Sequence, residues 1–215
     1  MPFEIVLKNQ LFFGLPTEEI KNALDLFDGL TQKYTKGTMI AHGTKLKRFG
    51  LVLSGTVQVS FTDIDGNLVL MASVASGDTF GESLCWLGVE EIPVIITAFE
   101  DSEVLWLSPD VFRRQNLSPL GNDLRNRFVS MLASKALAMN DRVQVLSKQT
   151  LRKKIVTYLS QESNRKGSKT FSIPFDRETL ALYLGVNRSA LSRELSQMQK
   201  EGIVEFYRNT FKILK

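Results

Sequence analysis

The clearest chemical pattern in this chain is formed by Arg188, Ser189, Ser192 and Arg193, which fall in one short segment. If a helix begins at Arg188, these four positions lie on its exposed side, near its N-terminal half. Guanidinium and hydroxyl groups are suited to guanine edges and phosphates. Asn187 directly precedes the segment and is a good N-cap. We therefore interpret these five residues as candidate contacts to duplex DNA.

The stretch from Asp176 to Lys200 predicts two helices joined by a tight turn. Gly185 ends the first helix and supplies the positive φ that a sharp turn needs. Apolar residues recur at helical spacing in both helices: Leu180, Ala181 and Leu184, then Leu191, Leu195 and Met198. This pattern predicts a helix-turn-helix whose second helix presents base-reading side chains. An ordinary helical hairpin with a solvated polar face is the alternative.

The distribution of charge favours the nucleic-acid interpretation. Residues 148–215 contain 14 Lys and Arg against 6 Asp and Glu, a net charge of +8. Residues 1–147 contain 13 basic and 17 acidic residues, a net charge of −4. A basic C-terminal third on an acidic body is typical of a nucleic-acid-binding module.

Composition limits the other classes of function. The chain has 215 residues, of which 43% are hydrophobic and 23% charged, as in a globular protein of one or two domains. Its start lacks a basic n-region, and no apolar run approaches the length of a membrane span, so we expect a cytoplasmic protein without a membrane partner. A lone Cys85 and a lone His42 predict no disulfide, metal or other cofactor. We find no catalytic or nucleotide-binding motif and expect no enzyme activity.

The N-terminal half combines one helical segment with many short strands. Residues 11–30 look helical, with Thr17 as a candidate cap and Ile20, Leu24 and Phe27 as a stripe. From residue 32 to 107, short alternating runs are punctuated by glycine, and residues 63–67 give a hairpin turn signal. This pattern predicts an antiparallel sandwich, barrel or β-roll.

A long helix is predicted from residue 120 to 147, after a short helix at residues 110–115. One face carries Leu124, Phe128, Met131 and Lys135, and Leu132, Ala136 and Met139 lie adjacent to it. A helix of 28 residues measures roughly 42 Å, more than one small β domain needs as a cover. We interpret it as a dimer seam formed by Leu124, Phe128, Met131 and Lys135. Burial of the whole helix within its own subunit is the alternative.

The C-terminal part is completed by a further helix and a small sheet. Residues 149–163 predict a helix with Leu151, Ile155 and Leu159 inward, and residues 171–175 a short strand. Residues 203–206 and 211–214 alternate around a turn and predict a β-hairpin, or wing, whose Arg208 would touch a phosphate. Residues 148–215 thus predict a winged helix-turn-helix.

This order of elements resembles the Crp–Fnr family of bacterial transcription regulators over essentially the whole chain. The motifs that carry the resemblance are Leu51-Val-Leu-Ser-Gly-Thr-Val, Ser76-Gly-Asp-Thr-Phe-Gly-Glu-Ser and Leu184-Gly-Val-Asn-Arg-Ser-Ala-Leu-Ser-Arg. The resemblance implies an α+β fold in which an antiparallel β-roll (a double-stranded β-helix, cupin-like) precedes a dimerisation helix and a winged helix-turn-helix. The expected domains are residues 1–119, an effector domain of cyclic-nucleotide-binding type, 120–147 and 148–215.

The resemblance also implies what the chain binds. A homodimer would bind a palindromic operator in double-stranded DNA and act with RNA polymerase. Arg193 matches the family's base-contacting arginine, and Ser192 resembles the serine that precedes it in the oxygen-sensing branch. Ser189 replaces a glutamate common in the family, which puts the family's usual base sequence in doubt. Glu194 replaces an apolar residue, so the local packing should differ.

The effector is less clear from the sequence. The segment Phe80, Gly81, Glu82, Ser83 and Leu84 resembles the family's cassette for the phosphate of cyclic AMP, where the glutamate takes the ribose hydroxyl and a later arginine pairs with the phosphate. No Lys or Arg occurs between Arg48 and Arg113. Because a buried phosphate without a cation is costly, we expect weak or no cyclic-nucleotide binding, and an effector of another kind or none.

Other interpretations were weighed on the same residues. If no cyclic nucleotide binds, Gly81 and Glu82 are a structural turn that the chain has retained from the family. The cysteine cluster of the oxygen-sensing branch is absent, and His42 lies too early to match the haem ligand of the carbon-monoxide branch. Cys85, between Leu84 and Trp86, is expected in the core, with a thiol sensor as the alternative. A cyclic-nucleotide-responsive regulator of the same architecture and a cupin-like metalloenzyme with a helical appendage remain as alternatives.

Overall fold

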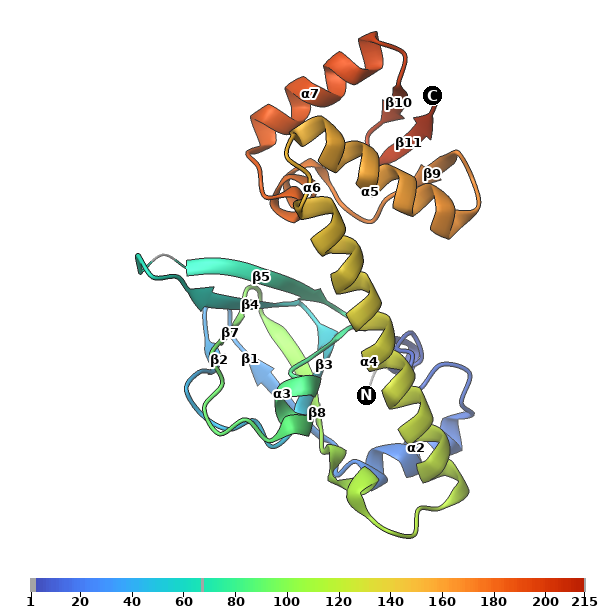
Figure 1. Cartoon of the computed structure of the whole chain (residues 1–215). Coiled ribbons are helices and arrows are strands. Elements are labelled where there is room, and N and C mark those ends of the chain that lie inside the picture. The colour runs from blue at the N-terminus through green and yellow to red at the C-terminus, as the bar shows by residue number, and fades with distance from the viewer. Residues whose placement is uncertain (1–2, 67, 215) are drawn as a thin grey trace. The chain divides into compact units, whose positions relative to one another are not determined.

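The computed structural model describes residues 3–66 and 68–214 and divides into two compact units at the bond between Ala133 and Ser134 (Figure 1). The first unit holds the N-terminal sheets, and the second holds the C-terminal helices and a small sheet. One long helix, α4 (Pro119–Leu146), contributes to both units. The α+β fold class expected from the sequence is confirmed.

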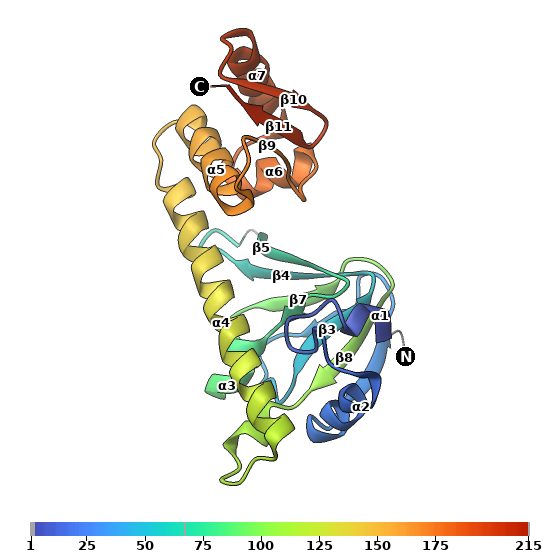
Figure 2. The same ribbon diagram turned by 90° about the vertical axis from the view of Figure 1, so that its right-hand side faces the viewer.

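The first unit is an antiparallel β-roll of two four-stranded sheets. One sheet has the strand order β1-β8-β3-β6 and the other β2-β7-β4-β5. Figure 2 shows β4, β5 and β7 of the second sheet side by side. The strands are β1 (Leu30–Tyr34), β2 (Met39–Ala41), β3 (Phe49–Ser54), β4 (Thr56–Thr62), β5 (Leu68–Ala75), β6 (Thr79–Phe80), β7 (Ile95–Ala98) and β8 (Ser102–Leu107).

Local sequence explains two features of this roll. The hairpin signal is confirmed, since β4 and β5 pair from Thr56 and Ala75 to Thr62 and Leu68; Asn67, within the predicted turn, lies outside the described residues. Gly50 on β3 is opposite Phe80, and a Cβ on Gly50 would come within 2.3 Å of that ring. The two strands can approach only because this position has no side chain.

Short helices complete the first unit: α1 (Phe3–Val6), α2 (Thr17–Leu26), α3 (Glu82–Leu87) and the 3-10 helix η1 (Pro109–Arg113). The prediction that Thr17 caps the first long helix is wrong. Pro16 occupies the N-cap position and Thr17 is already helical, because the fixed φ of proline suits this helix entrance. The sequence analysis also missed α3, which is too short for a helical period to show.

The helix α4 has two apolar faces, and only one of them is covered within the first unit. Leu124, Phe128 and Met131 are 0%, 2% and 3% exposed and belong to the core of the β-roll, where Phe128 packs against the rings of Phe49 and Phe112. These three side chains are therefore not available to a second copy, and the prediction that they form the dimer seam is wrong. Lys135, the fourth predicted residue, is exposed.

The second apolar face of α4, which lies beside the first, is largely uncovered. Six apolar residues lie along this face, and the spacing between them alternates between three and four residues. We call them the outer stripe: Val129, Leu132, Ala136, Met139, Val143 and Leu146. Val129, Met139 and Val143 are 59%, 64% and 59% exposed, and only Leu132 is half-buried. Spacings that alternate between three and four residues are those of a coiled-coil seam.

The second unit is a three-helix domain with a three-stranded antiparallel sheet in the order β10-β11-β9. Its elements after α4 are α5 (Leu151–Lys166), β9 (Thr170–Ser172), α6 (Arg177–Leu184), α7 (Arg188–Lys200), β10 (Val204–Tyr207) and β11 (Thr210–Ile213). The apolar stripes predicted for the last two helices meet in its core, where Leu184, Leu191, Leu195 and Met198 are fully buried.

Candidate nucleic-acid interface

The turn between α6 and α7 is set by residues at the two ends of α6. Asp176 caps its start, where the carboxylate accepts a hydrogen bond of 2.7 Å from the backbone N–H of Thr179; this bond holds the pKa of Asp176 below its usual value. Gly185 ends the helix with a φ of +64°. The ammonium of Lys154 donates to the carbonyl of Leu184 at 3.1 Å. Together these contacts fix the direction in which α7 leaves the turn.

The outward face of α7 carries the residues predicted to contact DNA. Arg188, Ser189 and Arg193 are exposed and Ser192 is half-buried, so the structure brings all four to one region near the start of this helix. Asn187 stands at the N-cap position, but its side chain makes no capping hydrogen bond. Asn187 is exposed to solvent at the helix entrance, next to Arg188 and Ser189.

Both arginines of this face are exposed, and the charge of Arg188 makes a small contribution to the lowered pKa of Asp176. Within the part of the chain that the structure describes, neither Arg188 nor Arg193 forms an ion pair or a side-chain hydrogen bond. A guanidinium that has no internal carboxylate partner keeps its full charge and its donors for an external anion. Arranged on a helix, such groups can contact phosphates and the acceptor edge of guanine.

The acidic residues of α7 are held on its other side by one arginine. The guanidinium of Arg152, at the start of α5, donates to Glu194 at 2.6 Å and to Glu201 at 2.6 and 3.1 Å. These hydrogen bonds raise the pKa of Arg152 above its ordinary value. The unusual glutamate at position 194 therefore has a structural explanation, because an ion pair replaces the apolar contact expected there.

The wing is the hairpin β10–β11, and its tip is exposed. Tyr207 and Thr210 are opposite each other, so Arg208 and Asn209 form the turn. Arg208 has a φ of +53°, which is unusual for a residue with a side chain. It is exposed and its guanidinium lies over the ring of Tyr207, 5.5 Å from the ring centre. Arg208 lies on a different element from the α7 residues, and within residues 3–66 and 68–214 no hydrogen bond or ion pair joins it to them.

The candidate effector residues lie at the entrance to α3. Phe80 is buried against Trp106, with ring centres 5.4 Å apart, and Gly81 adopts a φ of +79° at the N-cap. Glu82 is only 5% exposed, Leu84 is half-buried and Ser83 is exposed. The segment passes from the end of β6 at Phe80 through Gly81 into the first turn of α3 at Glu82 to Leu84.

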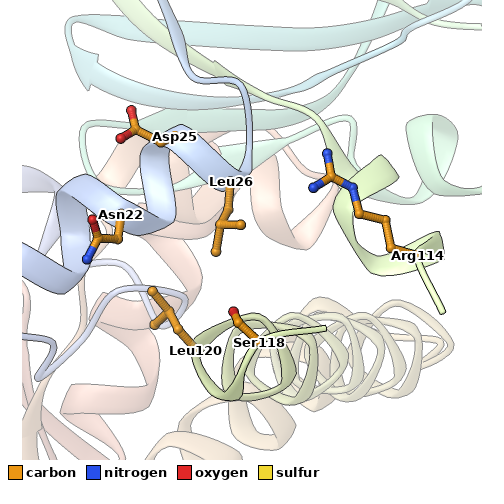
Figure 3. A pocket seen from close by; sticks show the side chains of 6 residues that line it. All are labelled: Asn22, Asp25, Leu26, Arg114, Ser118 and Leu120. Carbon is orange, nitrogen blue, oxygen red and sulfur yellow. The ribbon is translucent and has the colours of Figure 1, made fainter. Parts of the chain in front are cut away.

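A hollow of about 470 Å³ lies elsewhere in the first unit (Figure 3). It is lined by Asn22, Asp25, Leu26, Arg114, Ser118 and Leu120, which come from α2, the segment after η1 and the start of α4. None of these residues belongs to the candidate effector segment. The hollow therefore gives no support to that segment as a binding site.

Of the two residues considered for redox or metal chemistry, Cys85 lies in the core and His42 is exposed. Cys85 is 5% exposed in the core, and burial raises the pKa of its thiol to about 11. The ring of His42 is 3.3 Å from the carbonyl of Val94. Among the described residues, no group of three or more His, Cys, Asp or Glu is placed to hold a metal ion.

Two residues of the interface were missed in the sequence. Neither Arg152 nor Arg177 belongs to a motif or a periodic pattern in the sequence. In the structure, Arg177 lies against the wing, and burial lowers its pKa. The only sequence signal for either contact was the unusual Glu194, because partners far apart in the sequence leave no periodic pattern.

A helix-turn-helix with free arginines on its second helix, followed by a β-hairpin wing, defines a winged-helix DNA-binding module. Comparisons with known proteins agree with this class. Residues 153–215 match the model of the Crp-like helix-turn-helix domain, and residues 31–115 match the model of the cyclic nucleotide-binding domain. The chain belongs to the Crp–Fnr family and is a DNA-binding transcription regulator of that type.

Curated relatives match most of the chain. It is 27% identical over 209 residues to the cyclic AMP receptor protein of Thermus thermophilus, covering 94% of this chain and 91% of that protein. It is 23% identical over 193 residues to electron transport regulator A of Shewanella oneidensis, and the match covers 86% of this chain and 76% of that protein.

Solved structures share the fold. The regulator CLP of Xanthomonas campestris, described as responsive to c-di-GMP, has a TM-score of 0.61 at 19% identity over 93% of this chain and 100% of that one. OCPA-complexed CprK has a TM-score of 0.56 at 16% identity, over 93% and 92%. No helix within residues 3–66 and 68–214 combines the length and the apolar character needed to cross a membrane.

Proposed function

We propose that this regulator acts as a homodimer that reads a two-fold symmetric operator, with α7 of each subunit in the major groove. The observation that carries the proposal is the pair of exposed arginines on α7 that have no internal partner. Arg188, Ser189, Ser192 and Arg193 contact base edges and phosphates, and Asn187 contacts the backbone beside them. Arg208 adds a phosphate contact from the wing, and the complex works with RNA polymerase.

The outer stripe of α4 supports the dimer. Two parallel helices with apolar residues at this period bury them against each other, and Val143 and Leu146 extend the seam toward the DNA-binding unit. A dimer of this kind places two recognition helices about 34 Å apart, one turn of the duplex. The functional domains would be residues 1–119, 120–147 and 148–215.

The effector, where one exists, is proposed to be something other than cyclic AMP. The chain has no Lys or Arg between Arg48 and Arg113, a range that includes Phe80 to Leu84. Backbone N–H groups at Gly81 to Ser83 would offset only part of the cost of burying a phosphate there. Cyclic-nucleotide control of the same architecture is the alternative, and the similarity to a cyclic AMP receptor protein is what favours it.

The test is DNA binding by the full chain. An operator is first selected from a pool of random duplexes with the wild-type protein, and affinity is then measured by fluorescence anisotropy over a series of salt concentrations. Arg188→Ala and Arg193→Ala should each weaken binding by about 1–3 kcal/mol where the arginine reads a base. Where the arginine contacts a phosphate, its removal should make the negative slope of log K against log salt shallower by about 0.9.

Lys200→Ala is the matched control, because Lys200 is an exposed cation at the far end of the same helix. It should leave affinity close to that of the wild type. Thermal midpoints of all variants should agree, since the substituted side chains are exposed. Unchanged operator affinity in the double variant Arg188→Ala with Arg193→Ala would overturn the proposal.

A further inference from the structure

The side chain of Arg177 packs on the aromatic pair at the base of the wing. Phe206 on β10 and Phe211 on β11 are directly opposite each other, with ring centres 5.8 Å apart. The guanidinium carbon of Arg177 lies 5.0 Å from the centre of the first ring and 5.6 Å from the second. Both distances are within the range of a cation–π contact.

The same guanidinium reaches the turn of the wing. It donates a hydrogen bond of 3.2 Å to the backbone carbonyl of Arg208, the residue with the positive φ. A left-handed backbone conformation is strained for a residue with a side chain, and it persists where its surroundings fix it. Asn209 supplies a second tether, because it exchanges hydrogen bonds with the backbone N–H and carbonyl of Ile173.

The charge of Arg177 has no counter-ion nearby. In the described parts of the chain, this half-buried arginine has no carboxylate partner, and its contacts are two rings and one carbonyl. Arg177 is the first residue of α6. Its planar guanidinium therefore connects the helix-turn-helix to the tip of the wing. A lysine would keep the charge at this position but would lose the flat stacking surface and the fixed direction of the N–H donors.

We propose that Arg177 is a positioning residue for DNA binding: it holds the wing turn in the conformation that directs the Arg208 side chain at the DNA backbone. The proposal rests on the wing contact of the proposed function. Arg177 then acts through Arg208, and its effect on affinity depends on the presence of that side chain. A direct phosphate contact by Arg177 would instead act independently of Arg208.

The experiment is a double-variant cycle in the full chain, with the selected operator and anisotropy as the measurement. The single variants are Arg177→Lys and Arg208→Ala, and the third protein combines them. Each single variant should weaken binding by about five- to tenfold, and the combination should be no weaker than Arg208→Ala alone. Amide hydrogen exchange at Phe206 and Phe211 should be faster in Arg177→Lys.

Lys212→Ala is the matched control, because it removes an exposed wing cation that pairs with Glu205 away from the tip. It should change neither the exchange of the wing amides nor the coupling.

Three results would overturn the proposal. If the loss of affinity in the double variant equals the product of the two single losses, Arg177 contacts the DNA directly. Full affinity in Arg177→Lys would show that charge alone suffices. Full affinity in Arg208→Ala would remove the wing contact, and this failure is separate from that of α7, which Arg188→Ala reports.

Discussion

Arg152 on α5 and Glu194 on α7 are joined by a hydrogen-bonded ion pair of 2.6 Å, although 42 positions separate them in the sequence. The same guanidinium holds Glu201 at the end of α7. As a result, two of the acidic residues of the basic module are neutralised on the side of α7 that is turned toward α5. Arg188 and Arg193 then define the charge of the exposed face.

Removal of this arginine should weaken DNA binding without any change in the recognition residues. In Arg152→Ala, Glu194 and Glu201 lose their counter-ion, and their negative charge lowers the potential at α7. We expect reduced operator affinity, measured by anisotropy at low salt, and a smaller loss at high salt because the added charges are screened.

The charge explanation can be separated from a packing explanation by a second substitution. Glu194→Gln in the Arg152→Ala background removes the negative charge of the carboxylate at position 194 and should recover part of the affinity. If the affinity of the double variant stays at that of Arg152→Ala, the effect is due to displaced helices, and the electrostatic explanation is wrong.

The outer stripe of α4 should control the oligomeric state. Ala136→Asp or Met139→Asp places a charge in the middle of the proposed coiled-coil seam, where its burial without a partner is unfavourable. We expect sedimentation velocity to show a shift from dimer to monomer, together with a loss of affinity for an operator with two half-sites.

Two controls distinguish this seam from the inner face of the same helix. Ser134→Asp adds the same charge at an exposed position outside the stripe and should leave the dimer intact. Met131→Ala should lower the free energy of unfolding by about 2–5 kcal/mol, as expected for a large core residue, without a change in association. Dissociation caused by Met131→Ala but not by Met139→Asp would contradict the assignment of the two faces.

Cyclic nucleotides should not bind appreciably to the β-roll. Calorimetry of the full chain with cyclic AMP and with cyclic GMP should give no saturable heat at micromolar nucleotide, because the segment between Arg48 and Arg113 offers no cation to the phosphate. Saturable binding of either nucleotide in the micromolar range would establish the alternative, a cyclic-nucleotide-controlled regulator.

The thiol of Cys85 should behave as a core group with a measurable pH signature. Burial, with a smaller effect of the Asp110 charge, raises its pKa from an ordinary 9.0 to about 11. The unfolded thiol therefore ionises first as the pH rises, so the stability that this group contributes is complete below pH 9 and is lost between pH 9 and 11.

Urea unfolding of the wild type and of Cys85→Ala across this range checks the sign. The difference in unfolding free energy between the two proteins should shrink as the pH increases from 9 to 11. Iodoacetamide should modify the folded protein slowly at pH 8, since little thiolate is present. Rapid modification at that pH would instead favour a thiol sensor.

The sequence by itself determined most of the longer helices and strands and their order. Alternating residues around the turn at residues 63–67 predicted the β4–β5 hairpin, and the stripe of Leu191, Leu195 and Met198 predicted both α7 and its exposed face. These are local properties, because the side chains of a strand or a helix repeat with the period of its own backbone. The basic character of residues 148–215 likewise needs no fold to be counted.

Only the tertiary structure decided what covers each face and which distant residues meet. The sequence shows two apolar stripes on α4 but not which of them its own β-roll buries, and the hypothesis of a dimer seam was therefore placed on the stripe that the β-roll covers. The partners of Arg152 and Arg177 were equally hidden. Such contacts join segments that are remote along the chain, so they depend on how helices and strands pack and leave no repeat in the sequence.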